Sequence, residues 1–165
     1  MDTVTVTVEA TSGSLFAPED QSDSPRTSAY SPLLSGCAVG EGYVDDSLDE
    51  NGDPADALVL LDEPALPGRA ILARPIALAH LTVDGTASET LICVAAGQPK
   101  FDEITDFSTL ESWHASETTL ADVLQRFGPS HNWQVRGIDG PMAAEEFVRT
   151  TRHNFELMTG GFMDT

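Results

Sequence analysis

The sequence predicts an α+β protein in which a small β-barrel precedes C-terminal helices. Alternating or continuous apolar segments, typical of strands, occur within the first 95 residues, whereas helical periodicity first occurs near residue 119. The chain of 165 residues has the length of one ordinary domain and contains no internal repeat or compelling linker. We therefore expect a single domain over residues 1–165.

The first strand is expected at residues 3–9, where threonine and valine alternate with the period of a half-buried strand. Ser12-Gly13-Ser14 then marks a turn. Residues 17–42 are rich in serine, proline, glycine and acids, and we interpret them as long loops. An acidic loop with glycine and proline follows over residues 45–56.

Two apolar, extended segments come next, at residues 57–61 and 70–83. Pro75 marks an edge position or a bulge in the second, because proline cannot donate a ladder hydrogen bond. Asp84-Gly85 is a hairpin-turn signal, and residues 90–95 form the returning strand.

Two helices are expected late in the chain, with a short strand between them at residues 133–136. In the first helix, Thr119 and Asp122 have the spacing of a capping box, and apolar residues recur at helical spacing at Leu120, Val123, Leu124 and Phe127. The second runs from Pro141 to about Met158, and Gly160-Gly161 suits its end.

The net charge of the chain argues against two classes of binding partner. The chain has 27 acidic and 8 basic side chains, a net charge of −19 and a pI of about 4.1. This field repels nucleic acid and anionic membranes, so we expect neither as a partner. Adaptation of the whole proteome to high salt would explain the acidity equally well.

Met1–Glu9 has no basic region or apolar core of a signal peptide, so the expected location is the cytoplasm.

Five motifs occur in an order that resembles the soluble family I inorganic pyrophosphatases. They span residues 41–157 and are Gly42-Tyr43; Gly52-Asp53-Pro54-Ala55-Asp56; Pro67-Gly68 with Arg74-Pro75; Phe101-Asp102-Glu103-Ile104-Thr105-Asp106; and Trp133-Gln134-Val135 leading through Gly137 to Pro141-Met142-Ala143-Ala144-Glu145. The resemblance implies a closed five-stranded (OB-like) barrel flanked by helices. It also implies a homo-oligomer, often a hexamer in bacteria, and a pit of carboxylates that holds several Mg²⁺ ions and a small-molecule ligand.

The first metal-binding loop of the family matches residues 51–56. Magnesium ions neutralise diphosphate and convert a water into a nucleophile. By the resemblance, Asp53 lies beside the attacking water and Asp56 binds metal, which makes both catalytic and metal-site candidates. Asn51 stands in place of the first acid of the loop and is a poorer ligand for a hard cation. The alternative is structural, with Asp53 setting the turn before Pro54.

A second carboxylate pair, five residues apart, belongs to the hairpin loop in the family. Asp84 and Glu89 match it as metal ligands if one residue is inserted before the loop and one is removed after it. Without these gaps the positions are Val83 and Ser88, and no ligand is present. The structural alternative makes Asp84 an ordinary hairpin corner.

Two further catalytic candidates complete the set. Tyr43 comes from the first motif, because tyrosine is among the side chains that hold phosphate oxygens in the family. His80 falls near the end of the long strand, where it could enter the pit as an acid or base near pH 7. A histidine at the surface or at the edge of the core is the alternative.

The phosphate-holding cations of the family are missing at the matched positions. Each lost charge-assisted hydrogen bond to phosphate costs on the order of 1.5–3 kcal/mol, so the departures predict slow diphosphate hydrolysis. The residues found in place of the family residues are Thr90 or Leu91 instead of a lysine, Phe127-Gly128 instead of a Tyr-Lys pair, Thr5 and Thr7 instead of Lys and Glu, a position near Glu19 instead of an arginine, and Glu41 instead of a tyrosine.

Three hypotheses of function follow. The first is a pyrophosphatase-fold enzyme repurposed for a small organic molecule, in specialised biosynthesis for example, with little diphosphate hydrolysis. The second is a Mg²⁺-dependent inorganic pyrophosphatase. The third is a non-catalytic scaffold or regulator. Calorimetric binding of several Mg²⁺ ions distinguishes the second from the first.

Overall fold

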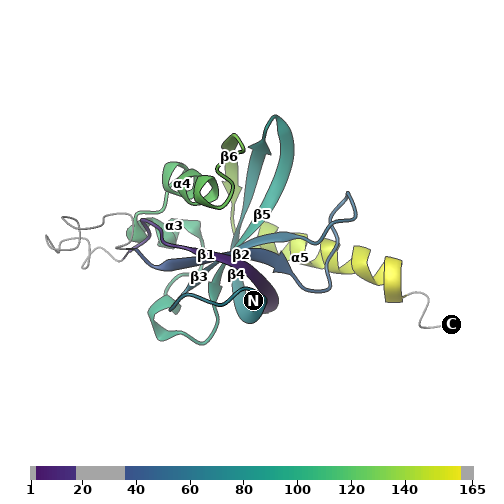
Figure 1. Ribbon diagram of the computed structural model, residues 1–165. Helices are drawn as coiled ribbons and strands as arrows, with labels where there is room; N and C mark the ends of the chain where they lie inside the picture. Colours follow the sequence, from purple (N-terminus) through teal and green to yellow (C-terminus); the bar gives the residue numbers. More distant parts are fainter. Residues whose placement is uncertain (1–2, 18–35, 161–165) are drawn as a thin grey trace, which may run out of the picture.

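A computed structural model describes residues 3–17 and 36–160 of the chain. Strands precede most of the helices, which confirms the predicted α+β class (Figure 1). The strands are β1 (Val4–Ser12), β2 (Ala38–Val44), β3 (Asp56–Leu61), β4 (Arg69–Val83), β5 (Thr86–Ala95) and β6 (Trp133–Asp139). The helices are η2 (Pro99–Phe101), α3 (Phe107–Leu110), η3 (Glu111–Trp113), α4 (Glu117–Phe127), α5 (Pro141–Phe155) and the π-helical η4 (Glu156–Gly160).

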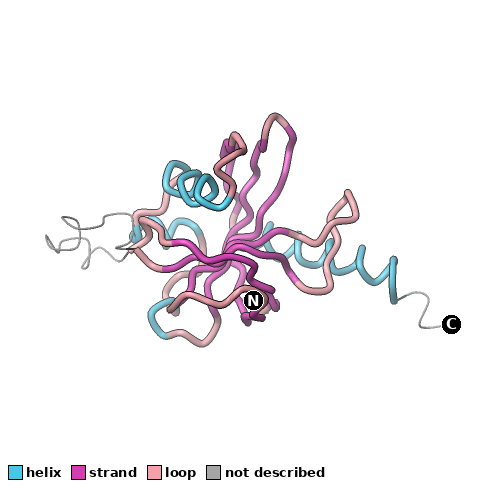
Figure 2. The backbone as a smooth tube through the Cα atoms, in the orientation of Figure 1, coloured by secondary structure: helices cyan, strands magenta, loops and turns pink. Residues whose placement is uncertain are grey.

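Five strands form a closed ring in the order β1-β2-β3-β5-β4, with β4 pairing back to β1, and β6 is added to β4 outside the ring. Figure 2 shows the strands converging at the centre of the molecule, with the helices towards its periphery. The length of β4 makes closure possible. Its first part, Arg69–Ala73, pairs with β1, and its remainder pairs with β5. The register shifts between Pro75 and Ala77, which confirms the predicted bulge at Pro75 and bends the strand between its two partners.

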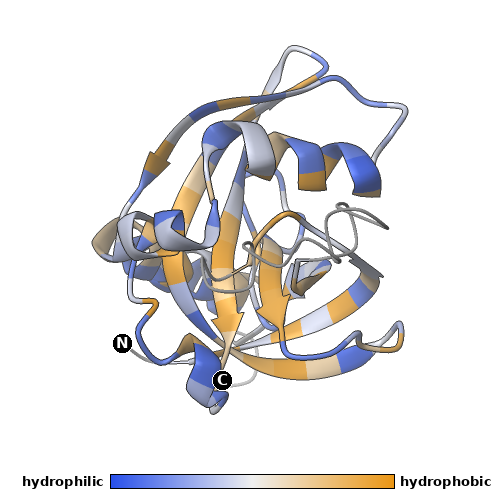
Figure 3. Ribbon diagram, turned by 90° about the vertical axis from the view of Figure 1, so that its left-hand side faces the viewer, coloured by the Kyte–Doolittle hydropathy of each residue, from blue (hydrophilic) through white to orange (hydrophobic). Residues whose placement is uncertain are grey.

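The alternation of side chains separates the inner and outer faces of the ring. Cross-strand partners point to the same face and successive residues to opposite faces. One connected set of partners, all buried, lines the inside of the ring: Val8, Gly42, Ala57, Leu91 and Leu78. On the outer face, α4 packs on β6 and α5 on β4, and Figure 3 shows apolar residues concentrated along the strands.

Three predictions of local structure were wrong. Residues 38–42 form part of β2 rather than a loop, because Gly40 and Gly42 replace the alternating apolar residues that would have marked a strand. Ser116 and Thr119 form the capping box of α4, one turn before the predicted pair. The short helices between Pro99 and Trp113 were not predicted. Residues 18–35 of the predicted loop region and Gly161 lie outside the described residues.

The second predicted helix is confirmed as α5, which begins at Pro141. No helix in the described ranges is long and apolar enough to cross a membrane.

Gly42 permits the close approach of β1 and β2. A Cβ added there would lie 1.8 Å from the backbone oxygen of Thr7, so the strands would have to separate. We expect Gly42→Ala to lower the free energy of unfolding by about 2 kcal/mol, measured by urea denaturation. Gly137→Ala is the matched control, because a Cβ there meets nothing within 4 Å. Equal effects of the two substitutions would contradict this interpretation.

Candidate active site

The acidic loop between β2 and β3 is organised by Asp49. The Asp49 carboxylate accepts hydrogen bonds from the backbone N–H groups of Asn51 (2.9 Å) and Asp53 (3.0 Å). The backbone N–H of Asp49 donates to the carbonyl oxygen of Asp53 at 2.6 Å. These bonds fix the turn that presents Asp53. Asp49 was not among the predicted site residues, and its role in this loop is structural.

Two further contacts hold this loop against the fold. The buried Ser47 hydroxyl donates to the Val44 carbonyl (2.6 Å) and accepts from the Ala55 N–H (3.0 Å). From α5, the Asn154 amide nitrogen donates to the Leu48 carbonyl at 3.1 Å. The loop that carries Asp53 is therefore fixed at both ends and against a helix.

Asp56 begins β3 on the outer face of the ring. Its cross-strand partners are Tyr43 on β2 and Thr90 on β5, so these three side chains share that face. Leu91 instead pairs with Ala57 and is fully buried. Of the two positions that could correspond to the family lysine, Thr90 is therefore the one beside Asp56.

The carboxylates on this part of the outer face repel one another. We call Glu9, Glu41, Asp49, Asp53 and Asp56 the acidic face. Partial burial, followed by the charges of Asp49, Asp53 and Glu9, raises the pKa of Asp56 to about 6. Burial, followed by the charges of Glu9 and Asp56, also raises the pKa of Glu41. A divalent cation would relieve this repulsion.

The raised pKa of Asp56 predicts a pH-dependent stability. Because the folded pKa, about 6, exceeds the ordinary value of 3.8, protonation favours the folded state, and this contribution is lost as pH rises through 6. Without divalent cations, Asp56→Asn should therefore raise the urea midpoint at pH 7.5, and the advantage should shrink towards pH 4. Glu63→Gln, at an exposed position outside the acidic face, should show no such trend. A pH-independent difference between wild type and Asp56→Asn would contradict the prediction.

Asp84 lies at the tip of the β4–β5 hairpin, away from Asp56. Its carboxylate contacts His131 Nδ1 at 2.6 Å and accepts from the Asn132 N–H at 2.8 Å. The hydrogen bond with His131, followed by that from Asn132, lowers the pKa of Asp84. β5 begins at Thr86, just after the turn, and at about 3.4 Å per residue the strand from Thr86 to Thr90 spans roughly 14 Å.

Glu89 and His80 face the opposite side of the sheet from Asp56. Glu89 precedes Thr90, so its side chain points to the other face. His80 Nδ1 lies 3.0 Å from a Glu89 oxygen, and its Nε2 lies 2.7 Å from an Asp139 oxygen. These contacts form a separate polar cluster beside β6.

The structure thus brings together some of the predicted site residues and separates others. Asp53, Asp56 and Tyr43 belong to the loop and the outer face, whereas Asp84, Glu89 and His80 do not. Within residues 3–17 and 36–160, no three histidine, cysteine or acidic side chains are grouped closely enough to hold one metal ion.

The donors that are present nevertheless fit Mg²⁺. This ion prefers hard oxygen ligands and usually keeps several waters, so one or two carboxylates together with substrate phosphates suffice. Asp53 and Asp56 supply two such carboxylates. Glu41 is a further acidic group on the acidic face. It lies two residues before Tyr43 in β2, and the side-chain period of two in a strand could have predicted that both share one face.

Solved structures with this fold are inorganic pyrophosphatases. The enzyme of Thermus thermophilus superposes with a TM-score of 0.64 at 24% identity, covering 94% of this chain and 92% of that one. The enzyme of Helicobacter pylori superposes with a TM-score of 0.65 at 20% identity, over 94% of each chain. These similarities confirm the predicted pyrophosphatase-like fold.

Sequence comparison then gives the family. The sequence profile of the family described as "Inorganic pyrophosphatase" matches residues 19–156. The inorganic pyrophosphatase of Streptomyces coelicolor is 33% identical over 120 residues, which are 68% of this chain and 74% of that protein. The match with the inorganic pyrophosphatase of Synechocystis, at 32% identity, covers 46% of this chain and only 45% of that protein. The chain is a divergent member of the inorganic pyrophosphatase family.

Proposed function

We propose that the protein is a Mg²⁺-dependent inorganic pyrophosphatase, which hydrolyses diphosphate to two phosphates. The observation that carries this proposal is the placement of Asp53 and Asp56 by one fixed loop on an acidic outer face, in a chain that belongs to this family. The comparisons favour this hypothesis over the repurposed enzyme, for which neither they nor the structure provide a specific observation.

In this proposal each residue on the acidic face has a defined task. Bound Mg²⁺ would supply charge neutralisation of diphosphate and a more acidic water. Asp56 would hold the metal, and Asp53 would hold and orient the attacking water as a hydrogen-bond acceptor. Tyr43, which is paired with Asp56, would donate its hydroxyl to a phosphate oxygen. Asp84, Glu89 and His80 have no part in it, because their contacts lie elsewhere.

The proposal also gives a rate expectation. Asp56 pairs with Thr90, which supplies a hydroxyl but no positive charge. Hydrolysis should therefore be slower, and more dependent on Mg²⁺ concentration, than in an enzyme with a lysine there. A homo-oligomer and a cytoplasmic location are parts of the same proposal and rest on the resemblance to the family.

Phosphate release from diphosphate, with millimolar Mg²⁺ and with EDTA, tests the function. We expect release that requires Mg²⁺ and a strong preference for diphosphate over p-nitrophenyl phosphate. Calorimetry with Mg²⁺ alone should detect binding that Asp56→Asn weakens. Absence of both Mg²⁺ binding and phosphate release would overturn the proposal and favour the hypothesis of a repurposed enzyme.

A further inference from the structure

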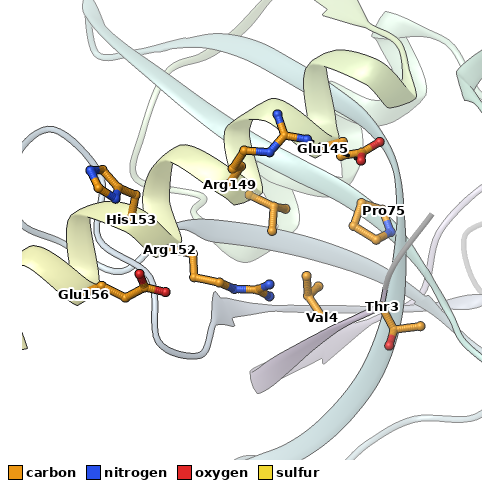
Figure 4. Close-up of a pocket in the computed structure, with 9 residues that line it drawn as sticks. Thr3, Val4, Pro75, Glu145, Arg149, Arg152, His153 and Glu156 are labelled. Carbon is orange, nitrogen blue, oxygen red and sulfur yellow. Dashed lines mark hydrogen bonds and ion pairs between the residues drawn. The ribbon is translucent and has the colours of Figure 1, made fainter. Parts of the chain in front are cut away.

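A cavity of about 270 Å³ lies between α5 and the β1 and β4 strands, apart from the acidic face (Figure 4). Its apolar wall comprises Val4, Pro75 and Val148. Its charged wall comes from α5 and includes Arg149 and Arg152, two of the eight basic residues in a chain with 27 acids. Basic side chains are scarce in this protein, so their presence around one cavity calls for a chemical explanation.

The two arginines differ in their partners. Arg149 is neutralised on its own helix, since it forms ion pairs with Glu146 and, at 3.4 Å, with Glu145. Arg152 forms no ion pair within the part of the chain that the structure describes. In Figure 4 its guanidinium extends along the cavity towards Val4 and Thr3, whereas that of Arg149 turns towards Glu145.

We propose that this cavity binds a small monocarboxylate with an apolar tail, with Arg152 holding the carboxylate and Val4, Pro75 and Val148 contacting the tail. A guanidinium matches the planar, two-oxygen geometry of a carboxylate. Among the described lining residues, Arg152 is the one arginine without an ion pair, and beside an apolar wall it suits a single negative charge. Glu145 and Glu156 also line the cavity, so a second negative charge would meet repulsion, which disfavours phosphate dianions. This site is independent of the proposed hydrolysis.

Methyl NMR of valine-labelled protein provides the test, with acetate, butyrate, hexanoate and inorganic phosphate as probes. The methyl groups of Val4 and Val148 should shift on titration, while Val59, fully buried in β3, serves as the reference. Each added CH₂ that is fully buried contributes about 0.8 kcal/mol, so the affinity should rise up to about fourfold per CH₂. Phosphate should bind no more tightly than acetate.

Three variants assign the role of Arg152. Arg152→Gln should weaken hexanoate binding about tenfold, the effect of losing one hydrogen bond to a charged group, and Arg152→Lys should restore part of it. Arg136→Gln, which removes the same charge from an exposed position on β6, should leave the affinity unchanged. The proposal is overturned if hexanoate does not shift Val4 and Val148, if tail length has no effect, or if Arg152→Gln binds as wild type does.

Discussion

Asp53→Ala is expected to reduce Mg²⁺-dependent phosphate release from diphosphate by at least about 100-fold, comparable to removing one preorganised group from a catalytic centre. The physical reason is positional. Asp49 accepts the Asp53 N–H at 3.0 Å and fixes the turn, so the Asp53 carboxylate is presented without further ordering. Alanine keeps this backbone bond and removes only the carboxylate. The measurement is kcat/KM for diphosphate at saturating Mg²⁺, together with a thermal unfolding curve that should change little.

Glu63→Ala is the control for this prediction, because it removes a carboxylate from an exposed position outside the acidic face and changes the net charge equally. It should retain wild-type kcat/KM. If the two variants lost activity equally, the effect would come from the change in the net charge of the protein and its electrostatic field. If Asp53→Ala kept wild-type activity, the attacking water would be held by another group. Glu41 would be the first to test, because burial, followed by the charges of Glu9 and Asp56, raises its pKa.

The fold could be predicted wherever side chains alone specify the local structure. The alternation in β1, the apolar run of β3 and the Asp84-Gly85 turn each depend on neighbouring residues, and all three are confirmed. β2 could not be predicted in full, because its glycines are explained only by close contact with β1: a Cβ on Gly42 would meet Thr7, which is distant in sequence. Packing between distant segments leaves no local pattern.

The candidate site shows the same division. Motif spacing predicted Asp53, Asp56 and Tyr43 as site residues, and the structure places all three in the β2–β3 loop and its flanking strands. It also predicted Glu89, which the structure places on the opposite face of β5, because the match of a loop with gaps does not reveal which face of a strand a residue occupies. A shift of one residue reverses that face, and only the parallel pairing of Asp56 with Thr90 shows that Glu89 points away.

The pairing of Asp56 with Thr90 also predicts that Thr90→Lys increases kcat/KM for diphosphate. The new side chain would start beside Asp56 on the acidic face, where an ammonium group lowers the pKa of that carboxyl and can donate to a phosphate oxygen. One charge-assisted hydrogen bond of about 1.5–3 kcal/mol corresponds to an increase in kcat/KM of about 10- to 100-fold. Thr90 is only 6% exposed, so the lysine must extend its stem along the surface, and we expect a loss of about 1–2 kcal/mol in the free energy of unfolding.

Two substitutions separate this local effect from its alternatives. Thr118→Lys adds the same charge at an exposed position of α4, so an equal gain there would assign the effect to long-range attraction of diphosphate. Leu91→Lys places the charge one residue further along, on the inner face where Leu91 is fully buried, and should prevent folding rather than raise activity. A folded Thr90→Lys protein with unchanged kcat/KM would mean that the missing cation does not limit turnover. The limit would then lie in the metal ligands, with Asn51 as the next position to change, because an aspartate there adds the first acid of the loop.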